Sequence, residues 1–439
     1  MRFHVLASAV AVGLLTFSSA VPALAADGFW YFEVLNVDAA HQDGFTGDGV
    51  TIAVIDSPIN TEVPTLADAN IEVREPSFCY AADGSGPMPA KSTALTGQAG
   101  ALHGTAVTSL IVGSGAGYNG GGGVKGVAPD AKVLYYTIFG SSDQGASNIE
   151  CLDENGDEST DIALAEAMNE AMDAGATIIA VSSLQTPGPE LYAAQIRAVN
   201  EGVIVVGGMP NTSDVVFSAG WPGQANGAVG VQAADSSGAI ATTAGLPNTD
   251  DGTVVVAPGI GIAKQGSDTS WEDEELTNGT SLATPIVSGF LALVAQKYPD
   301  ATGNQLLQTL IHNTGADDHE LMLDATGAIG YGFVSATHML RVDPSQYPDE
   351  NPLILDSGIP TIAEFASGYE AGTEPTPSST PSPSPTETTS DEQPRTPVGI
   401  IVGVGVGALV LVSVITLVFL LARRSRQSSD TGRGSSPGQ

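Results

Sequence analysis

Asp56, His103 and Ser281 are the residues of this 439-residue chain whose types and surroundings best suit covalent catalysis. A serine hydroxyl is a weak nucleophile at neutral pH and needs a base, a role for which histidine has a suitable pKa. A carboxylate must in turn hold the imidazole in the correct tautomer. Asp, His, Ser is one of the few chain orders known for this triad. Spacings of 47 and 178 residues mean that only a tertiary fold can bring the three together.

The tetrahedral intermediate of such a reaction carries an oxyanion, which needs hydrogen-bond donors. We predict two donors: the backbone N–H of Ser281 at a helix start, and the side-chain amide of Asn211, which follows the apolar run VIVVGG. Each residue taken singly has an ordinary alternative, as a helix cap, a structural histidine or a turn residue. The prediction therefore depends on the joint pattern.

Alternating strand and helix patterns are expected to position these residues. Amphipathic stretches over 161–175 and 190–202 predict helices. Short β-branched runs predict buried strands over 50–55, 132–139, 176–183, 203–208, 228–233 and 253–258. This alternation favours a doubly wound α/β fold, with a mostly parallel sheet covered by helices on both faces. In such sheets, functional residues gather at the carboxyl ends of the strands.

The helix that begins near Ser281 has two unusual residues close to its start. Gly279 permits a close backbone approach beside the serine. We expect Pro285 in the first helical turn, where a proline is tolerated.

The runs VIDS, HGTAV and GTSLATP resemble the three signature motifs of the subtilases, the subtilisin-like serine endopeptidases. The segments GVAPDAKV, WPG and APG follow in the order typical of that family, and the resemblance covers roughly residues 30–340. It implies peptide-bond hydrolysis through an acyl-enzyme at Ser281, with Asn211 as an oxyanion donor. It also implies that Ser183 and Leu184, at the end of a strand, bind an extended protein or peptide substrate.

The sequence departs from the family pattern in three ways. Pro58 and Pro210 stand where glycines are usual, and Gln185 with Thr186 replaces a usual Gly-Gly pair. Proline fixes φ and lacks an N–H, so the backbone near the site is open to displacement at Pro58 and Pro210. Gln185 and Thr186 lie on the strand expected to bind an extended substrate.

The N-terminal 25 residues predict a secretory signal peptide, because Arg2 precedes a 13-residue apolar run and an A-x-A site ends at Ala25. The alternative is an uncleaved anchor or a buried helix. We expect residues 26–371 to form the peptidase domain with a short N-terminal extension.

Three further segments follow that domain. Residues 372–397 are rich in Pro, Ser and Thr and predict an extended stalk. Residues 398–422 carry no charge, and about 20 apolar residues suffice to cross a bilayer as a helix. The basic tail, 423–439, is expected in the cytoplasm by the positive-inside rule, which places the catalytic domain outside the cell membrane. Gly399, Gly403 and Gly407 form a small-residue face that either packs on another helix or is simply tolerated.

The chain is strongly acidic, with 14 Lys and Arg against 49 Asp and Glu and a net charge of −35. Binding to nucleic acid needs clustered Lys and Arg side chains, so the composition excludes a nucleic-acid-binding protein. Residues 26–371 hold 44 of the acids and eight of the bases. We expect no required cofactor and no metal site; calcium on acidic loops such as 268–275 is the alternative.

Cys79 and Cys151 are the two cysteines of the chain. In an extracellular setting a disulfide between them is the natural hypothesis, and two free thiols are the alternative.

Signal peptide, subtilase domain, stalk, membrane helix and basic tail together resemble a mycosin, a membrane-anchored subtilase of type VII secretion systems. Only 30 residues separate the expected mature start from Asp56, which is too few for the folded propeptide usual in secreted subtilases. The resemblance implies trimming of a secreted substrate, stabilisation of a membrane secretion complex, or both. A catalytically weak scaffold and a general cell-surface subtilase are the alternatives.

Overall fold

The computed structural model describes residues 28–97, 99–141, 149–211, 220–243, 246–250, 252–324 and 326–368. These belong to the first of two compact units, Met1–Glu374, and the second unit is Pro375–Gln439. The segments predicted as signal peptide (1–25), stalk (372–397), membrane helix (398–422) and basic tail (423–439) lie outside the described residues. None of the helices in the described part has the length and apolarity needed to cross a membrane.

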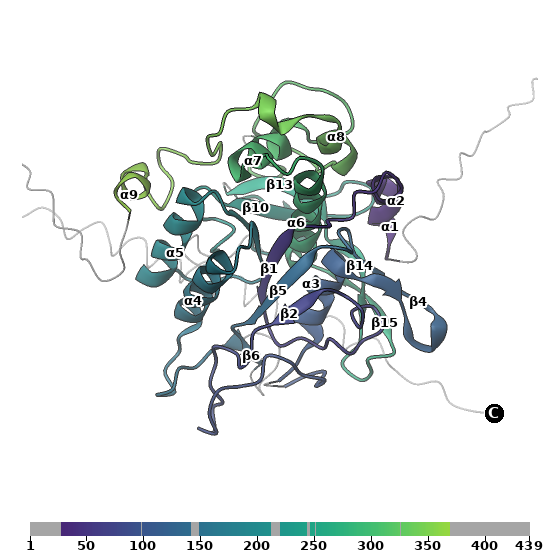
Figure 1. Ribbon diagram of the computed structural model, residues 1–439, viewed down its shortest axis with the longest axis vertical. Coiled ribbons are helices and arrows are strands. Elements are labelled where there is room, and N and C mark those ends of the chain that lie inside the picture. The colour runs from purple at the N-terminus through teal and green to yellow at the C-terminus, as the bar shows by residue number, and fades with distance from the viewer. Residues whose placement is uncertain are drawn as a thin grey trace, which may run out of the picture. The chain divides into compact units, whose positions relative to one another are not determined.

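A seven-stranded sheet forms the centre of the domain (Figure 1). All its neighbouring strands pair in parallel. In spatial order the strands are β13 (Thr253–Pro258), β10 (Val229–Ala234), β9 (Ile204–Gly208), β8 (Ile178–Val181), β1 (Thr51–Asp56), β5 (Lys132–Thr137) and β2 (Ile71–Val73). The strand order reverses beside β1, so the carboxyl end of β1 lies at a topological switch point, where ligand crevices form in sheets of this kind.

Helices cover both faces of the sheet, as the sequence predicts. The helices are α1 (Trp30–Val34), α2 (Val37–Gln42), α3 (Leu102–Val112), α4 (Thr160–Asp173), α5 (Pro189–Asn200), α6 (Thr280–Lys297), α7 (Gly303–His312), α8 (Ala336–Arg341) and α9 (Ile362–Ser367), with 3₁₀ turns η1 (Tyr118–Gly120) and η3 (Pro344–Gln346). α4 and α5 pack on one face, and α3 and α6 pack on the other.

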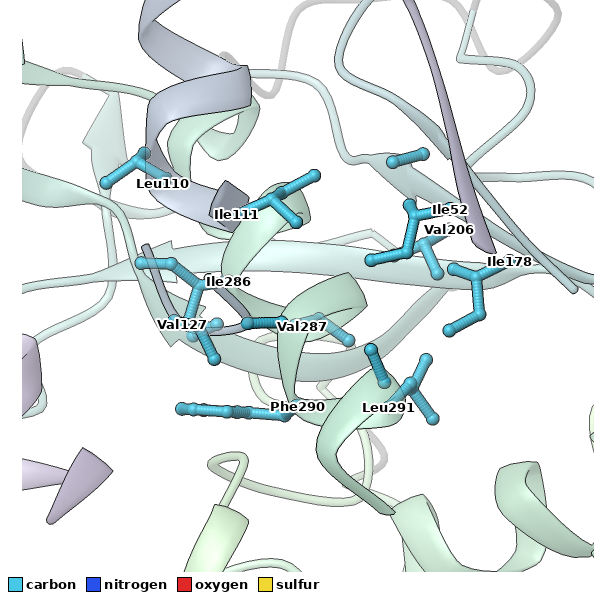
Figure 2. Close-up of a cluster of buried hydrophobic side chains, with 14 of the residues drawn as sticks. Ile52, Leu110, Ile111, Val127, Ile178, Val206, Ile286, Val287, Phe290 and Leu291 are labelled. Carbon is cyan, nitrogen blue, oxygen red and sulfur yellow. The ribbon is translucent and has the colours of Figure 1, made fainter. Parts of the chain in front are cut away.

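Strand alternation sorts the side chains of β1 between these two layers. Ile52 and Val54 point to the cluster of α3 and α6, whereas Ala53 and Ile55 point to that of α4 and α5. Figure 2 draws part of the first cluster, with Ile52, Leu110, Ile111, Val127, Ile178, Val206, Ile286, Val287, Phe290 and Leu291 labelled. Asp56 continues the alternation of Ile52 and Val54, so its side chain belongs to the α3 and α6 face.

α6 is buried along most of its length, from Thr280 to Val294 apart from Ser281. A helix that is apolar all round lies inside a protein, so its hydrophobic packing fixes the position of its N-terminus. The expectation for Pro285 is wrong: it is the sixth residue of α6 and lies in the second turn. A proline there removes the N–H that would bond to the Ser281 carbonyl.

Four short antiparallel pairs complete the described strands. They are β3 (Ser114–Ala116) with β4 (Gly122–Lys125), β6 (Gly140–Ser141) with β7 (Ile149–Glu150), β11 (Thr242–Thr243) with β12 (Leu246–Pro247), and β14 (Ile260–Gln265) with β15 (Glu274–Asn278). The acidic stretch 268–275 forms the turn of the last hairpin and the start of β15. This hairpin packs against α3, where Leu102 meets Gly266.

Cys79 and Cys151 form a disulfide, as predicted from the sequence. Both cysteines are fully buried, and next to them Tyr80 N–H donates to the Leu152 carbonyl at 2.8 Å. The bond joins the segment before α3 to the segment before α4.

The disulfide closes a loop with a sequence separation of 72 residues. In the chain-entropy model a loop of this size stabilises the folded state by about 4 kcal/mol. We therefore expect the double variant Cys79→Ala/Cys151→Ala to lose about that much unfolding free energy in urea titrations of the full chain. A reductant should bring the wild type to the level of the variant and leave the variant unchanged; equal stability of the two oxidised proteins would contradict this account.

Candidate active site

Asp56 is the last residue of β1, and its side chain is only 1% exposed. Its Oδ1 accepts a hydrogen bond from the Ser57 N–H at 2.7 Å and contacts His103 Nδ1 at 2.7 Å. A buried carboxylate is costly unless it is paired, so these contacts stabilise its charge. Asp56 Oδ2 is buried without a hydrogen-bond partner among the described residues.

His103 is the second residue of α3, whose first turn lies directly against the end of β1. Gly104 makes this approach possible: a Cβ there would lie 2.7 Å from the carbonyl oxygens of Ser57 and Pro58. Because Asp56 can only accept, the contact places a proton on His103 Nδ1 and leaves Nε2 as the basic nitrogen. This is the tautomer that a general base for serine requires.

Opposing effects set the pKa of His103. Desolvation in the cleft lowers the pKa, but the charge of Asp56 and its hydrogen bond outweigh this, and the net pKa is raised. The positive charge of Lys264 on β14 acts in the lowering direction. The side chain of His103 remains 41% exposed, so solvent reaches it.

Ser281 is the second residue of α6. Gly279 precedes the helix, and a Cβ there would lie 3.0 Å from Ser281 Oγ. The glycine therefore leaves room beside the nucleophilic oxygen, and the helix start supplies a backbone N–H for an anion.

Asn211 follows β9, and Thr280 fixes the orientation of its amide. The Thr280 N–H donates to Asn211 Oδ1 at 2.9 Å, while the Thr280 hydroxyl donates to the Met209 carbonyl at 2.7 Å. A backbone N–H can only meet the amide oxygen, so Nδ2 is the part of the amide that can donate to an oxyanion beside Ser281.

A single cavity of about 280 Å³ brings the predicted site residues together. Its lining consists of Asp56, His103, Phe139, Ser182, Ser183, Leu184, Gln185, Gly208, Asn211, Thr280 and Ser281. These residues come from the carboxyl ends of β1, β8 and β9, from just beyond β5, and from the starts of α3 and α6. The arrangement holds a nucleophile, a base with its orienting carboxylate, and oxyanion donors, which is a complete set for acyl transfer.

The departures from the family pattern affect this cavity unequally. The Asp56 to His103 contact is intact despite Pro58, and the Asn211 to Thr280 contact is intact despite Pro210. Gln185 differs: its N–H donates to the Trp221 carbonyl at 2.8 Å, and its own carbonyl accepts from Trp221 N–H at 3.1 Å. Both backbone groups of Gln185 are thus occupied, so an extended substrate must pair with other residues of this edge.

Four cavity residues, Phe139, Ser182, Gly208 and Thr280, were not predicted as site residues from the sequence. Thr280 lies inside the GTS run that singled out Ser281, so its place was available from the motif. Phe139 follows β5. Its sequence position did not indicate a site residue, because an apolar residue at the end of a strand is expected to belong to the hydrophobic core.

Within the described ranges, no three His, Cys, Asp or Glu side chains are grouped so that they could hold a metal ion. In the acidic 268–275 segment, Asp273 Oδ2 accepts from the Ser267 hydroxyl at 2.6 Å, and Glu275 pairs with Lys264 at 3.3 Å. These contacts use two of the carboxylates that a calcium site there would need.

Comparison with known families assigns the fold and chemistry. The subtilase family matches residues 47–332, which is more than half of the chain. The chain belongs to the subtilase family. Its members are serine endopeptidases, and subtilisin BL of Lederbergia lenta is 29% identical over 314 residues, covering 71% of this chain and 98% of that protein. A thermostable alkaline protease of Halalkalibacterium halodurans is 30% identical over 299 residues, covering 67% of this chain and 68% of that protein.

A solved structure extends the comparison beyond the bacterial subtilisins. MycP1 from the ESX-1 type VII secretion system has a similar fold, with a TM-score of 0.53 and 22% identity. The similarity covers 74% of this subtilase and 88% of MycP1. The subtilisin-like α/β fold is thereby confirmed.

Asn211→Ala removes the side-chain oxyanion donor. We expect kcat to fall by about 10²–10³ with little change in KM, because the lost hydrogen bond forms only in the transition state. Asn211→Asp is the matched variant: it keeps an acceptor for the Thr280 N–H but loses the donor, so its kcat should fall at least as far. Wild-type kcat in Asn211→Ala would remove this residue from the oxyanion site.

The pH dependence of kcat/KM should report the charges around His103, because only the neutral imidazole acts as a base. Lys264 lowers the pKa of His103, so Lys264→Met should raise it and move the acid limb of the profile to higher pH. Asp56→Asn removes the influences that raise the pKa, so its acid limb should move to lower pH, with kcat reduced by about 10⁴.

Lys132→Met is the control for Lys264→Met. Lys132 begins β5, at the opposite end of the strands, and pairs there with Glu72 at 2.8 Å. Its removal should leave the acid limb in place. A limb that does not move in Lys264→Met, or that moves equally in Lys132→Met, would show that Lys264 has no specific effect on His103.

Proposed function

We propose that this subtilase is a membrane-anchored, extracellular, mycosin-like endopeptidase that processes a substrate of a type VII secretion system, stabilises that system, or does both. The chemical part of the proposal rests chiefly on one observation: the paired Asp56 and His103 share a single cavity with Ser281 and Asn211.

The geometry supports a two-step acyl transfer. Ser281 Oγ forms a bond to the scissile carbonyl carbon while His103 Nε2 takes its proton, and Asn211 Nδ2 with the Ser281 N–H stabilises the oxyanion. His103 then gives that proton to the leaving amine as the C–N bond breaks. A water loses a proton to His103 and attacks the acyl-enzyme, and Ser281 leaves and regains its proton. Throughout, Asp56 accepts the hydrogen bond from the His103 Nδ1–H, which stays on the ring.

Two independent features support the secretion role. The fold is similar to that of MycP1, which is described as part of the ESX-1 type VII secretion system. The sequence also combines a predicted signal peptide, stalk, membrane helix and basic tail with the catalytic domain. The proposal places the catalytic domain outside the cell and the tail in the cytoplasm.

A scaffold of low catalytic activity is the second candidate. The pairing of Gln185 with Trp221 favours it, because it removes backbone groups from the edge expected to bind substrate. A scaffold needs the fold and the membrane segment but not the nucleophile, so the two candidates differ in their dependence on Ser281.

The test uses the full chain in its native membranes and two readouts of Ser281→Ala. A fluorophosphonate probe should label the wild type, and Ser281→Ala should abolish labelling because the nucleophile is gone. Ser288→Ala is the matched control, since Ser288 lies two turns along α6 and donates to the Thr284 carbonyl. An unlabelled but folded wild type would contradict the enzymatic proposal.

Secretion of type VII substrates provides the second readout. If processing is the main role, Ser281→Ala should leave a substrate uncleaved. If cells that carry Ser281→Ala secrete these substrates normally, and deletion of the protein stops their secretion, scaffolding is the main role. Normal secretion after deletion would leave a general cell-surface subtilase.

A further inference from the structure

We propose that Tyr135 is a positioning residue for the Asp56 and His103 pair, acting through Ser57. Tyr135 lies on β5, outside the cavity. This inference rests on the proposed catalytic role of that pair and names a residue that holds it in place.

The Tyr135 side chain is fully buried on the same face of the sheet as Asp56. In the parallel register of β1 and β5, Tyr135 lies opposite Val54, two residues before Asp56. Its side chain extends toward the carboxyl end of β1, where its hydroxyl donates to the Ser57 carbonyl at 2.6 Å. Burial, and secondarily the charge of Asp56, raise the pKa of this phenol far above its usual value, so the hydroxyl remains a donor at all working pH values.

Three groups of Ser57 make hydrogen bonds, two of them to the segments that carry the catalytic pair. Its N–H donates to Asp56 Oδ1 at 2.7 Å, and its hydroxyl accepts from the Gly104 N–H at 3.0 Å. Gly104 is the neighbour of His103 in the first turn of α3. The third group, the Ser57 carbonyl, is held by Tyr135. Ser57 therefore joins the strand that carries Asp56 to the helix that carries His103. Tyr135 holds Ser57 in place from the neighbouring strand, β5.

The Tyr135 hydroxyl also lies close to Gly104. A Cβ on Gly104 would lie 1.9 Å from the Tyr135 hydroxyl oxygen. The hydroxyl thus occupies the space that the missing side chain leaves, between the turn at Ser57 and the first turn of α3. Loss of the hydroxyl removes both a hydrogen bond and the atom that separates these two segments.

Pro58 restricts the backbone of the preceding residue, Ser57, to extended conformations. It also has no N–H to offer to the surrounding turn. A buried carbonyl without a partner is unfavourable, so the phenol supplies the donor that holds the turn in the conformation that Asp56 needs.

Tyr135→Phe in the full chain tests the proposal. Small displacements of catalytic groups reduce rate more than binding, so we expect kcat to fall about tenfold and KM to change less than twofold. We also expect the downfield proton NMR signal of His103 Nδ1–H, observed in histidine-labelled protein, to move upfield as the contact with Asp56 lengthens. This second readout needs no substrate, so a failure of the proposed function and a failure of this inference are distinguishable.

Tyr136→Phe is the matched control. Tyr136 is the next residue of β5, its side chain points to the opposite face of the sheet, and it is also buried. This variant should leave kcat and the Nδ1 proton signal unchanged. Wild-type kcat with an unmoved signal in Tyr135→Phe would overturn the proposal, and so would equal effects in the two variants.

Ser57→Ala keeps the test decisive if Tyr135→Phe does not fold. It removes the acceptor of the Gly104 N–H while the Tyr135 hydroxyl and the Ser57 carbonyl remain. The same lowered kcat, stable KM and displaced Nδ1 signal are expected, because the connection from Ser57 to α3 is broken. An unaltered Nδ1 signal in Ser57→Ala would show that this connection does not position the pair.

Discussion

The buried carboxylate of Asp56 is the constraint on which the catalytic part of this domain depends. A side chain that is 1% exposed at the end of a central strand must find partners, and it finds them in the Ser57 N–H and in His103. Those partners require α3 to begin directly against the strand end, which only a glycine at position 104 permits. The end of β1, the turn after it and the first turn of α3 are therefore one structural unit.

Ser281 reaches the same place by a different physical route. α6 is buried almost all round, and its apolar side chains pack with those of α3 and of the sheet (Figure 2). Hydrophobic packing thus sets where the helix begins. Hydrogen bonds of Thr280 with Met209 and Asn211 then fix the first residues of the helix. Ser281 is positioned mainly by hydrophobic packing, whereas His103 is positioned mainly by hydrogen bonds.

Strong local patterns made much of this predictable from the sequence. The long β-branched runs became β1, β5, β8, β9, β10 and β13, and the predicted site residues meet in one cavity. β2 was missed because it has three residues and depends on pairing with β5, about 60 positions later. Pro285 was misplaced because the motif does not show where α6 begins. The pairing of Gln185 with Trp221 joins residues 36 positions apart, and no local pattern reports such a contact.

The differences from related subtilases separate chemistry from substrate binding. Pro58 and Pro210 both replace expected glycines, yet the contacts of Asp56 with His103 and of Asn211 with Thr280 have ordinary hydrogen-bond lengths. The Tyr135 hydroxyl donates to the Ser57 carbonyl beside Pro58, and the Thr280 hydroxyl donates to the Met209 carbonyl beside Pro210. At Gln185, by contrast, the backbone N–H and carbonyl are paired with Trp221. The contacts of Asp56 with His103 and of Asn211 with Thr280 are therefore retained beside the two prolines. The strand edge at Gln185 is altered, and it is there that we expect the substrate specificity of this chain to differ from that of the subtilisins.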